Sequence, residues 1–349
     1  MPITQETLDM MILAMPVLLI GMAIIALLLL CFRCWRTACA LLIAALALNS
    51  WLEQIPCHII TEPLPNVKPE GTLRVLEYNV CGKSEYAPLH GEEFLDYVRS
   101  VDADFIFLPE NTGGVCTRLE KMLRQEYPHS LHDFETFEKE CGFGDYSIYC
   151  RYPLSGFKNH KLDLQQLLVD YPYVDTLEVK RESRNMMVFE ATADVDGTPV
   201  TLVHVHLRTN AYDSAIENGG KRQKIKQLYE KLMFGYAFRK AEAEAMADSL
   251  ANCPNPLIVC GDFNDFSGSR CIQTIQDCRR NNIYPDHRDR LRDAWWEGGC
   301  GMGFTFVDLG LYLRLDHLLY SKEFRLRAVD APRKPYSDHC PLIVDLELK

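Results

Sequence analysis

The chain has 349 residues and a formal net charge of −11, with 48% hydrophobic and 24% charged residues. This length accommodates two average domains or one large α/β sandwich with an appendage, and the composition is that of a folded protein. The negative charge argues against a sequence-independent binder of long nucleic acid, because such proteins need a basic surface. The one basic stretch, Lys221 to Lys240, is typical of a solvated helix face.

Two uncharged segments lie near the N-terminus. Residues 11–31 carry no charged side chain, and about twenty apolar residues at about 1.5 Å each match a bilayer core of roughly 30 Å. This segment predicts a transmembrane helix. Residues 37–52 form a shorter apolar run and predict the second helix of a hairpin. Residues 1–52 are therefore predicted to be a membrane anchor.

The first segment could instead be a cleaved signal peptide. The nine residues before Met10 hold two acids and no Lys or Arg, which disfavours a signal peptide and favours an uncleaved anchor. Arg33 and Arg36 lie between the two apolar runs, and positive charges favour the cytoplasmic side. A two-helix hairpin in the cell membrane would then place the following domain on the extracytoplasmic side. A single span would leave that domain in the cytoplasm.

The rest of the chain divides into a linker and one folded domain. Residues 53–70 contain four prolines and no periodicity, as in a linker. Residues 71–349 alternate short apolar runs with helical stretches, which predicts a layered α/β fold. The runs that predict strands are LRVLEYNV, DFIFLPE, YSIYC, MMVFEATADV, VTLVHVHL, PLIVCGDF, LDHLLYS and PLIVDLEL.

Polar residues follow or begin several of these strands. Taken singly, each is explained as a turn residue, a helix cap or an ordinary histidine. Together they combine oxygen ligands for Mg²⁺ with imidazoles, which suits activation of water against a phosphoester; zinc is disfavoured because the histidines lack close Cys/His spacing. The set is Asn79, Glu110, His206, Asp262, Asn264, Asp316, His317, Asp338 and His339.

Seven motifs in order resemble those of the endonuclease/exonuclease/phosphatase superfamily: LRVLEYNV, FIFLPEN, YSIYCRYPL, VHVHL, GDFND, FTF…RLDHLLYS and SDHCPLIVDLEL. The resemblance covers essentially everything after the anchor and linker. It implies a four-layer α/β/β/α sandwich similar to deoxyribonuclease I. It also implies a hydrolase of phosphoesters that uses Mg²⁺, with Mn²⁺ as a possible substitute.

The resemblance assigns metal and phosphate contacts residue by residue. Glu110 looks like the family's metal-binding glutamate, with Asn79 and Asp338 as further metal or hydrogen-bonding groups. Asn264 and His206 resemble the residues that hold the substrate phosphate, a role that Asn79 would share.

The same resemblance assigns the proton-transfer groups. Asp262 looks like the residue that orients or deprotonates the attacking water, and His339 looks like the catalytic imidazole, acting as base or acid according to branch. Asp316 resembles the carboxylate that orients His339, and His206 adds a catalytic donor to the phosphate. This arrangement is physically consistent, because in-line attack builds negative charge on phosphate oxygens while a paired His–Asp handles the proton.

Some features depart from the family pattern or stay open. Pro109 precedes the glutamate ligand where the family usually has Gln, and Cys81 stands where apurinic endonucleases carry Asp. Arg184 and Arg314 are candidates to face the substrate phosphate. Of the cysteines, Cys81, Cys150, Cys260 and Cys340 are predicted to be free and structural, while Cys116 with Cys141, or Cys271 with Cys278, could pair in an oxidising compartment.

The substrate is open among a nucleic acid, a phospholipid headgroup and a small phosphate ester. The alternative function is a catalytically inactive binding module held at the membrane. That alternative predicts the loss of Glu110, Asp262 or His339, and all three are present.

Overall fold

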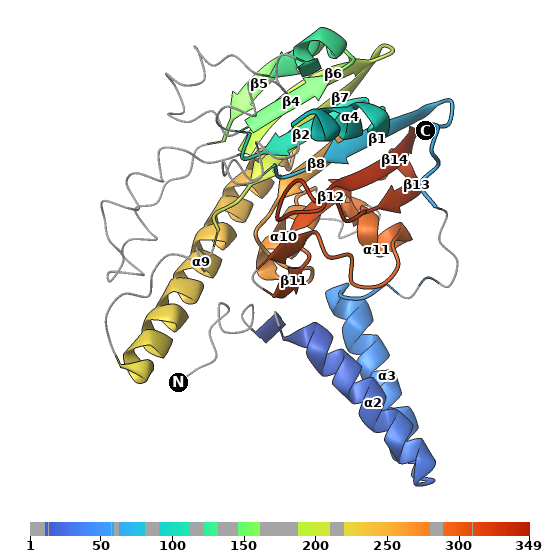
Figure 1. The fold of residues 1–349 in the computed structure, drawn as a ribbon, viewed down its shortest axis with the longest axis vertical. Helices are drawn as coiled ribbons and strands as arrows, with labels where there is room; N and C mark the ends of the chain where they lie inside the picture. The colour runs from blue at the N-terminus through green and yellow to red at the C-terminus, as the bar shows by residue number, and fades with distance from the viewer. Residues whose placement is uncertain are drawn as a thin grey trace.

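The structure of the chain is a computed structural model. It describes residues 11–12, 14–56, 58, 63–80, 91–111, 122–131, 146–160, 188–209, 220–279, 289–308 and 310–349. Cys81, Arg184 and the Cys116–Cys141 pair therefore lie outside the described residues. Two six-stranded sheets and the helices around them form the main body (Figure 1).

The first sheet has the strand order β13-β14-β1-β2-β4-β3. Its central strands β1 and β2 are parallel, and the other neighbours are antiparallel. The strand bounds are β1 (Thr72–Glu77), β2 (Phe105–Pro109), β3 (His129–Leu131), β4 (Tyr146–Cys150), β13 (Phe324–Asp330) and β14 (Leu342–Leu348).

The second sheet has the order β5-β6-β7-β8-β12-β9, with β7 and β8 parallel. A separate two-stranded hairpin is formed by β10 (Phe306–Asp308) and β11 (Leu311–Leu313). The strands of the second sheet are β5 (Leu154–Asn159), β6 (Val188–Val195), β7 (Thr198–His206), β8 (Leu257–Asp262), β9 (Arg292–Asp293) and β12 (Asp316–Tyr320).

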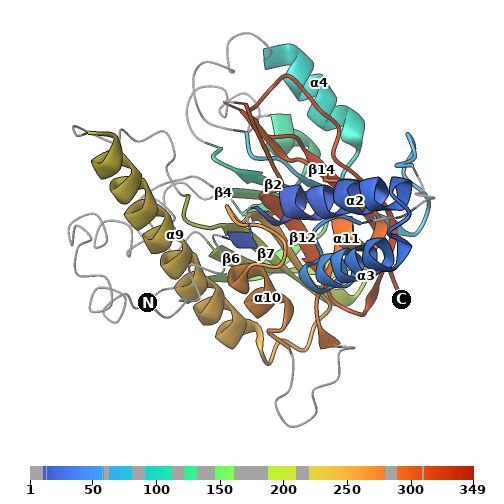
Figure 2. The ribbon, with the colours of Figure 1, turned by 90° about the horizontal axis from the view of Figure 1, so that it is seen from below.

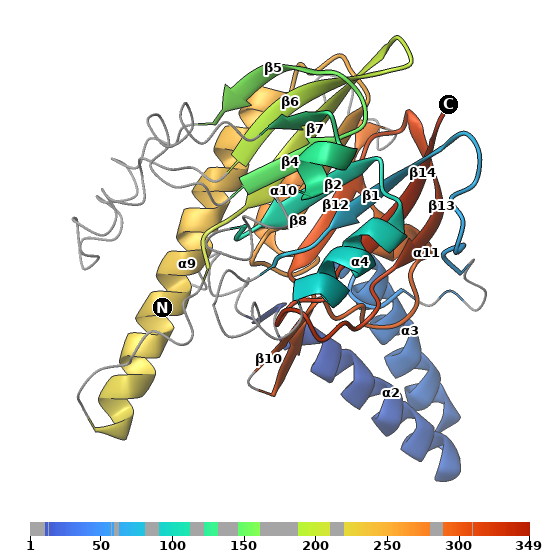
Figure 3. The same cartoon turned by 45° about the horizontal axis from the view of Figure 1, so that its top comes forward.

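Helices cover the outer face of each sheet, so the domain has four layers (Figure 3). Helix α4 (Gly91–Val101) and residues 122–126 pack on the first sheet. The long helix α9 (Lys221–Leu250) and helix α10 (Arg270–Gln276) pack on the second. Helix α11 (Ala294–Gly298) adjoins β12 and β13. This arrangement confirms the predicted α/β/β/α sandwich.

The apolar runs in the sequence arise because the central strands are buried on both faces. In β8, Ile258 and Cys260 face the core between the sheets, while Leu257 and Val259 face α9 and α10. Successive side chains of a strand point to opposite faces, so a strand covered on both sides has no polar position in its interior. Buried polar residues break this pattern, among them Glu77 on β1 and the Arg74–Asp345 pair that joins β1 to β14.

The cysteines are free throughout the described residues, including buried Cys150, Cys260 and Cys340. Cys271 and Cys278 are also free thiols, so the open possibility of a bond between them is not realised. Both are buried against the second sheet, where a thiol packs as a small apolar group.

Two apolar helices form a hairpin that projects from the sandwich, side by side in Figure 2. They are α2 (Met15–Cys31) and α3 (Trp35–Leu52). By length and composition α3 could cross a membrane, and α2 is a shorter apolar helix. Large apolar side chains stay exposed on both helices, including Val17 at 75% and Ile43 at 67%. The predicted helices are confirmed as helices; their insertion into a membrane stays a prediction.

Candidate active site

Three strands of the second sheet bring polar side chains to one edge. In the sheet register His206, at the end of β7, lies beside Asp262, at the end of β8. Asp262 in turn lies opposite Asp316, the first residue of β12. Because β12 runs antiparallel to β8, the start of one strand falls at the end of the other. Residues far apart in the sequence therefore meet at this edge.

The first sheet supplies the facing groups. Asn79 and Glu110 follow the parallel strands β1 and β2, and the ladder continues past the strand ends because the amide of Val80 donates to the carbonyl of Pro109 at 3.1 Å. The Ser337 hydroxyl donates to the carbonyl of Asn79 at 2.8 Å, which places the segment before β14 at the same edge. Pro109 is accommodated here as the last residue of β2.

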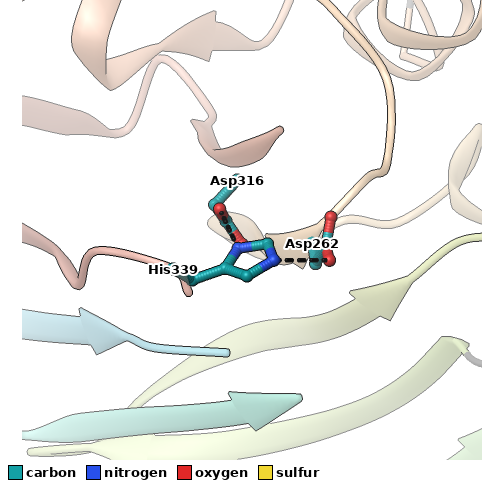
Figure 4. Close-up of side chains that lie close together, drawn as sticks. All are labelled: Asp262, Asp316 and His339. Carbon is teal, nitrogen blue, oxygen red and sulfur yellow. Dashed lines mark hydrogen bonds and ion pairs between the residues drawn. The ribbon is translucent and has the colours of Figure 1, made fainter. Parts of the chain in front are cut away.

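His339 lies between two carboxylates, as Figure 4 shows. Its Nδ1 is 2.7 Å from Oδ2 of Asp316, a hydrogen bond, and its Nε2 is 3.8 Å from Oδ2 of Asp262, within ion-pair distance. All three residues are buried. The ring of Phe306 stacks edge-on against the imidazole, with 5.1 Å between ring centroids. The imidazole is therefore fixed on three sides.

These contacts set the charge of the site. Burial lowers the pKa of His339, but the charge and hydrogen bond of Asp316, together with the charges of Asp262 and Asp338, outweigh it and raise the pKa to about 10. Burial and the charge of Asp316 raise the pKa of Asp262 to about 6, although His339 and His206 oppose the shift. At neutral pH the site thus holds a protonated imidazole beside an ionised carboxylate.

Asn79 joins the two sheets across the site. Its side-chain nitrogen donates to Oδ2 of Asp262 at 3.0 Å and to Oε1 of Glu110 at 3.2 Å. Nε2 of His206 lies 3.8 Å from the same two oxygens. Glu110 has a φ of 55°, a left-handed conformation that costs a non-glycine residue about 1–3 kcal/mol. That strain holds the Glu110 carboxylate toward Asn79.

Asn264 and Asp338 lie beside this set. The backbone N–H of Asn264 donates to Oδ1 of Asp262 at 2.8 Å, and its side-chain amide donates to the carbonyl of Leu207 at 3.0 Å. An amide nitrogen carries two hydrogens, so the bond to Leu207 uses half of its donor capacity. Oδ1 of Asp338 accepts from the Ser337 hydroxyl at 3.2 Å.

The acidic groups fit a hard divalent cation. In the part of the chain that the structure describes, one group of side chains has ligand atoms close enough to share an ion: Asp262, Asp316 and His339, within 4.8 Å of one another. His339 is a poor ligand there, because a protonated imidazole has no lone pair to give. The carboxylate of Glu110 is 37% exposed, which suits Mg²⁺ because that ion keeps several water ligands. Glu110 with Asn79 therefore remains the better cation position.

One buried acid near the site was not among the predicted residues. Glu77 is fully buried behind the site, and burial together with the charges of Asp316 and Asp262 raises its pKa well above the usual range. Its protonated form can donate to Asp316, which would help to fix that carboxylate. A single acid inside the apolar run LRVLEYNV was the sequence signal for it.

Two predicted candidates belong to a different cluster. Arg314 is paired with Asp293 at 3.3 Å, and it donates to the backbone carbonyl of Glu53 at 3.2 Å and to the hydroxyl of Ser267. The prediction that Arg314 could face the substrate phosphate is therefore wrong. His317, which follows Asp316, binds the same Asp293 at 2.9 Å because successive strand residues point to opposite faces.

Comparisons with known proteins agree with this geometry. The sequence model of the Endonuclease/Exonuclease/phosphatase family matches residues 76–339. An endonuclease/exonuclease/phosphatase from Beutenbergia cavernae is 16% identical with a TM-score of 0.52, covering 80% of this chain and 72% of that one. The corresponding protein from Bacteroides vulgatus is 15% identical with a TM-score of 0.51, covering 80% and 99%.

A TDP2 of D. rerio, humanised by 14 mutations, is also similar in structure. It is 15% identical with a TM-score of 0.50, covering 79% of this chain and 99% of that one. At such identities these similarities show a shared fold. A comparison with curated protein sequences gave no match.

Proposed function

Because the chain belongs to the endonuclease/exonuclease/phosphatase family, whose members are metal-dependent phosphoester hydrolases, we propose that it is a membrane-tethered, Mg²⁺-dependent phosphoester hydrolase. The substrate would be a phosphodiester or a phosphomonoester. The observation that carries the proposal is the placement of His339 between Asp316 and Asp262. This arrangement supplies a general acid and a general base side by side, which favours a hydrolase over a binding module of the same fold.

The proton transfers follow from the charges of the site. Attack of water forms a new P–O bond in line with the bond to the leaving alcohol, which breaks. Asp262, ionised above about pH 6, accepts the proton of the attacking water. His339, protonated below about pH 10, gives its proton to the leaving oxygen, and Asp316 keeps the ring oriented.

The remaining residues position the phosphate. His206 and Asn264 would donate to its non-bridging oxygens, where negative charge builds during attack. Asn79 would share this role by exchanging its hydrogen bond to Glu110 for one to the phosphate, since both of its amide hydrogens are otherwise used. Glu110 would hold Mg²⁺ or Mn²⁺, with Asn79 and Asp338 as further ligands. The bound ion would supply positive charge to the same phosphate oxygens.

The exposed apolar surface of α2 and α3 supports the membrane tether. Large apolar side chains exposed along two neighbouring helices are unusual in soluble proteins, and burying them in a bilayer is favourable. Trp35 and Trp51 lie at the two ends of α3, the positions that tryptophan prefers at membrane interfaces. With Arg33 in the connecting turn and Arg36 in the first turn of α3 on the cytoplasmic side, the domain would lie on the extracytoplasmic side of the cell membrane.

The test is hydrolysis by the full-length chain in nanodiscs, with Mg²⁺ or with EDTA. The panel contains bis-p-nitrophenyl phosphate, p-nitrophenyl phosphate, plasmid DNA, RNA, sphingomyelin and inositol phosphates. We expect turnover of at least one substrate that EDTA abolishes and that His339→Ala or Asp262→Ala lowers roughly 10²–10⁴-fold. Arg325→Gln changes an exposed residue of β13 and serves as the control variant, which should keep the native rate. Near-native turnover by a folded His339→Ala variant would remove that residue from the mechanism.

A further inference from the structure

The base of the helical hairpin packs against the loops that carry the site. Ile12 and Leu52 form one apolar cluster with Phe266 and Leu315. Phe266 lies four residues after Asp262, and Leu315 directly precedes Asp316. A Cβ on Gly268 would lie 2.5 Å from the carbonyl oxygen of Leu52, so the two backbones are in close contact. The hairpin thus ends against the active-site loops.

Polar contacts fix the orientation at this junction. The Glu53 carboxylate contacts Arg290 and accepts from the side chain of Gln276 at 3.0 Å. The side chain of Gln54 donates to the backbone carbonyl of Ser267. Arg314 donates to the Glu53 carbonyl, as described above. Residues 53 and 54 are therefore part of the folded junction, and the direction of the helices relative to the site is set.

The membrane surface would then lie at the level of the site. Apolar residues of α3 are exposed up to Trp51, at 71%, and the next residue, Leu52, is already buried in the junction. The headgroup layer of one leaflet is roughly 5–8 Å thick. Phe306 packs against the junction cluster and also against the ring of His339, so one side chain separates them. If α2 and α3 insert as proposed, the headgroup layer would therefore lie near the catalytic histidine.

A cavity lined by charged side chains of both signs opens beside His339. It has a volume of about 530 Å³, within the range of small-ligand sites. Val307 of β10 lines one part, and His339 and Asp338 line another. Arg333 and Lys334 add two cations to its wall, and Asp308 adds a second carboxylate to that of Asp338. This cavity suits an anionic group larger than the reacting phosphate alone.

We infer that the substrate is a phosphoester of a membrane lipid, whose headgroup enters the cavity between β10 and residues 333–340 while its chains remain in the bilayer. This inference rests on the proposed hydrolase function and on insertion of α2 and α3. For a soluble substrate, a catalytic histidine close to the point where α3 would leave the membrane gives no advantage. The hydrolysis itself is the one described above, with the lipid phosphate as the reacting group.

The experiment uses the full-length chain in phosphatidylcholine nanodiscs, where both faces of the bilayer are accessible. The apparent KM for bis-p-nitrophenyl phosphate, or for p-nitrophenyl phosphate if that is the one turned over, is measured with Mg²⁺. Three additions are compared: phosphatidic acid in the disc, oleate in the disc at the same mole fraction, and soluble glycerol 3-phosphate at the same bulk concentration. The salt concentration is physiological, where the Debye length is about 8 Å.

We expect phosphatidic acid to raise the apparent KM about tenfold, and oleate and glycerol 3-phosphate to change it by about twofold or less. The double variant Arg333→Gln/Lys334→Gln should reduce the rise to about twofold relative to its own KM, whereas Arg325→Gln should retain it.

Each other outcome overturns the inference in a distinct way. No rise with phosphatidic acid excludes the lipid. An equal rise in KM with glycerol 3-phosphate points to a soluble substrate. An equal rise with oleate means that the negative charge of the disc surface, and not binding of the lipid phosphate, causes the effect. A full rise in the double variant removes the cavity from the proposal. If neither p-nitrophenyl substrate is hydrolysed, the apparent KM is measured with the member of the panel that is. If no member of the panel is hydrolysed, the hydrolase function itself has failed, and the inference falls with it.

Discussion

Oδ2 of Asp316 lies 2.7 Å from Nδ1 of His339, and this buried contact sets the charge of the imidazole. The charge of Asp316 is the largest of the effects that raise the His339 pKa against burial. Its charge also raises the pKa of Asp262. The Asp316 carboxylate therefore raises the pKa of both groups that are proposed to move protons.

The pH dependence of kcat/KM should be bell-shaped. Activity should rise as Asp262 loses its proton near pH 6 and fall as His339 loses its proton near pH 10. Asp316→Asn removes a negative charge that raises both pKa values, so both limbs should move to lower pH. Steady-state rates at fixed Mg²⁺ measure the limbs. Asp248→Asn, an exposed residue of α9, is the matched control and should leave them in place. An unmoved alkaline limb in Asp316→Asn would assign that limb to another group.

Metal dependence should respond to Glu110. Glu110→Gln keeps the size of the side chain but removes the charge that favours a divalent cation. We expect the Mg²⁺ concentration for half-maximal rate to rise about tenfold or more, since changes to residues that only hold a ligand in place already cost about 10–100-fold in metal affinity. Titration calorimetry of Mg²⁺ gives a readout that is independent of turnover.

Glu244→Gln on the exposed face of α9 serves as the control for this change. Equal Mg²⁺ affinity in Glu110→Gln and Glu244→Gln would place the ion elsewhere, with the Asp262–Asp316 pair as the next candidate.

Packing of the hairpin on the site should depend on Gly268. Its φ is +78°, close to the +76° of Gly71, so alanine at either position costs about 1–2 kcal/mol in backbone strain. A Cβ on Gly268 would in addition meet the Leu52 carbonyl at 2.5 Å, whereas Gly71 has open space around it. Overpacking of this kind adds roughly 1–3 kcal/mol. Thermal unfolding in nanodiscs should therefore show a lower Tm for Gly268→Ala than for Gly71→Ala. Equal Tm values would mean that Leu52 does not pack on Gly268 in the membrane.

The strands and the residues of the site were predictable because they depend on local patterns. Strands buried on both faces are mostly apolar, and polar residues that end such strands stand out, as Asp262 and Glu110 do. The two helices of the hairpin were predictable from a local pattern as well, namely long apolar runs with few or no charged residues. Such patterns predict where a residue lies along a strand or helix.

The junction between hairpin and domain was not predictable from such patterns. Glu53 and Gln54 lie in a proline-rich stretch that resembles a linker, yet both pack into the domain. Their partners Arg290 and Ser267 are more than two hundred residues away. Arg314 was misjudged for the same reason, since its buried partner Asp293 is identifiable only from the tertiary fold.

The Arg314–Asp293 pair should stabilise the folded protein at neutral pH and lose this effect in acid. Burial raises the pKa of Asp293, but Arg314 and His317 outweigh burial and hold that pKa well below its usual range. A carboxylate with a depressed pKa adds stability above its unfolded pKa of about 4, and that stability is lost as the pH falls. Arg314→Met leaves the buried Asp293 carboxylate with His317 alone and should cost about 3–5 kcal/mol near pH 7.

Because Arg314→Met also raises the Asp293 pKa, acid unfolding should begin at a higher pH in this variant. The double variant Arg314→Met/Asp293→Asn removes both charges and should recover much of the loss, since a neutral pair in this position leaves no buried charge unpaired. Thermal unfolding between pH 2 and pH 8 measures both effects, and Arg325→Met, whose side chain is 59% exposed, should change stability by about 0.5 kcal/mol or less. A double variant less stable than Arg314→Met would show that the contacts of Arg314 with the Glu53 carbonyl and Ser267, and not its charge, stabilise the junction.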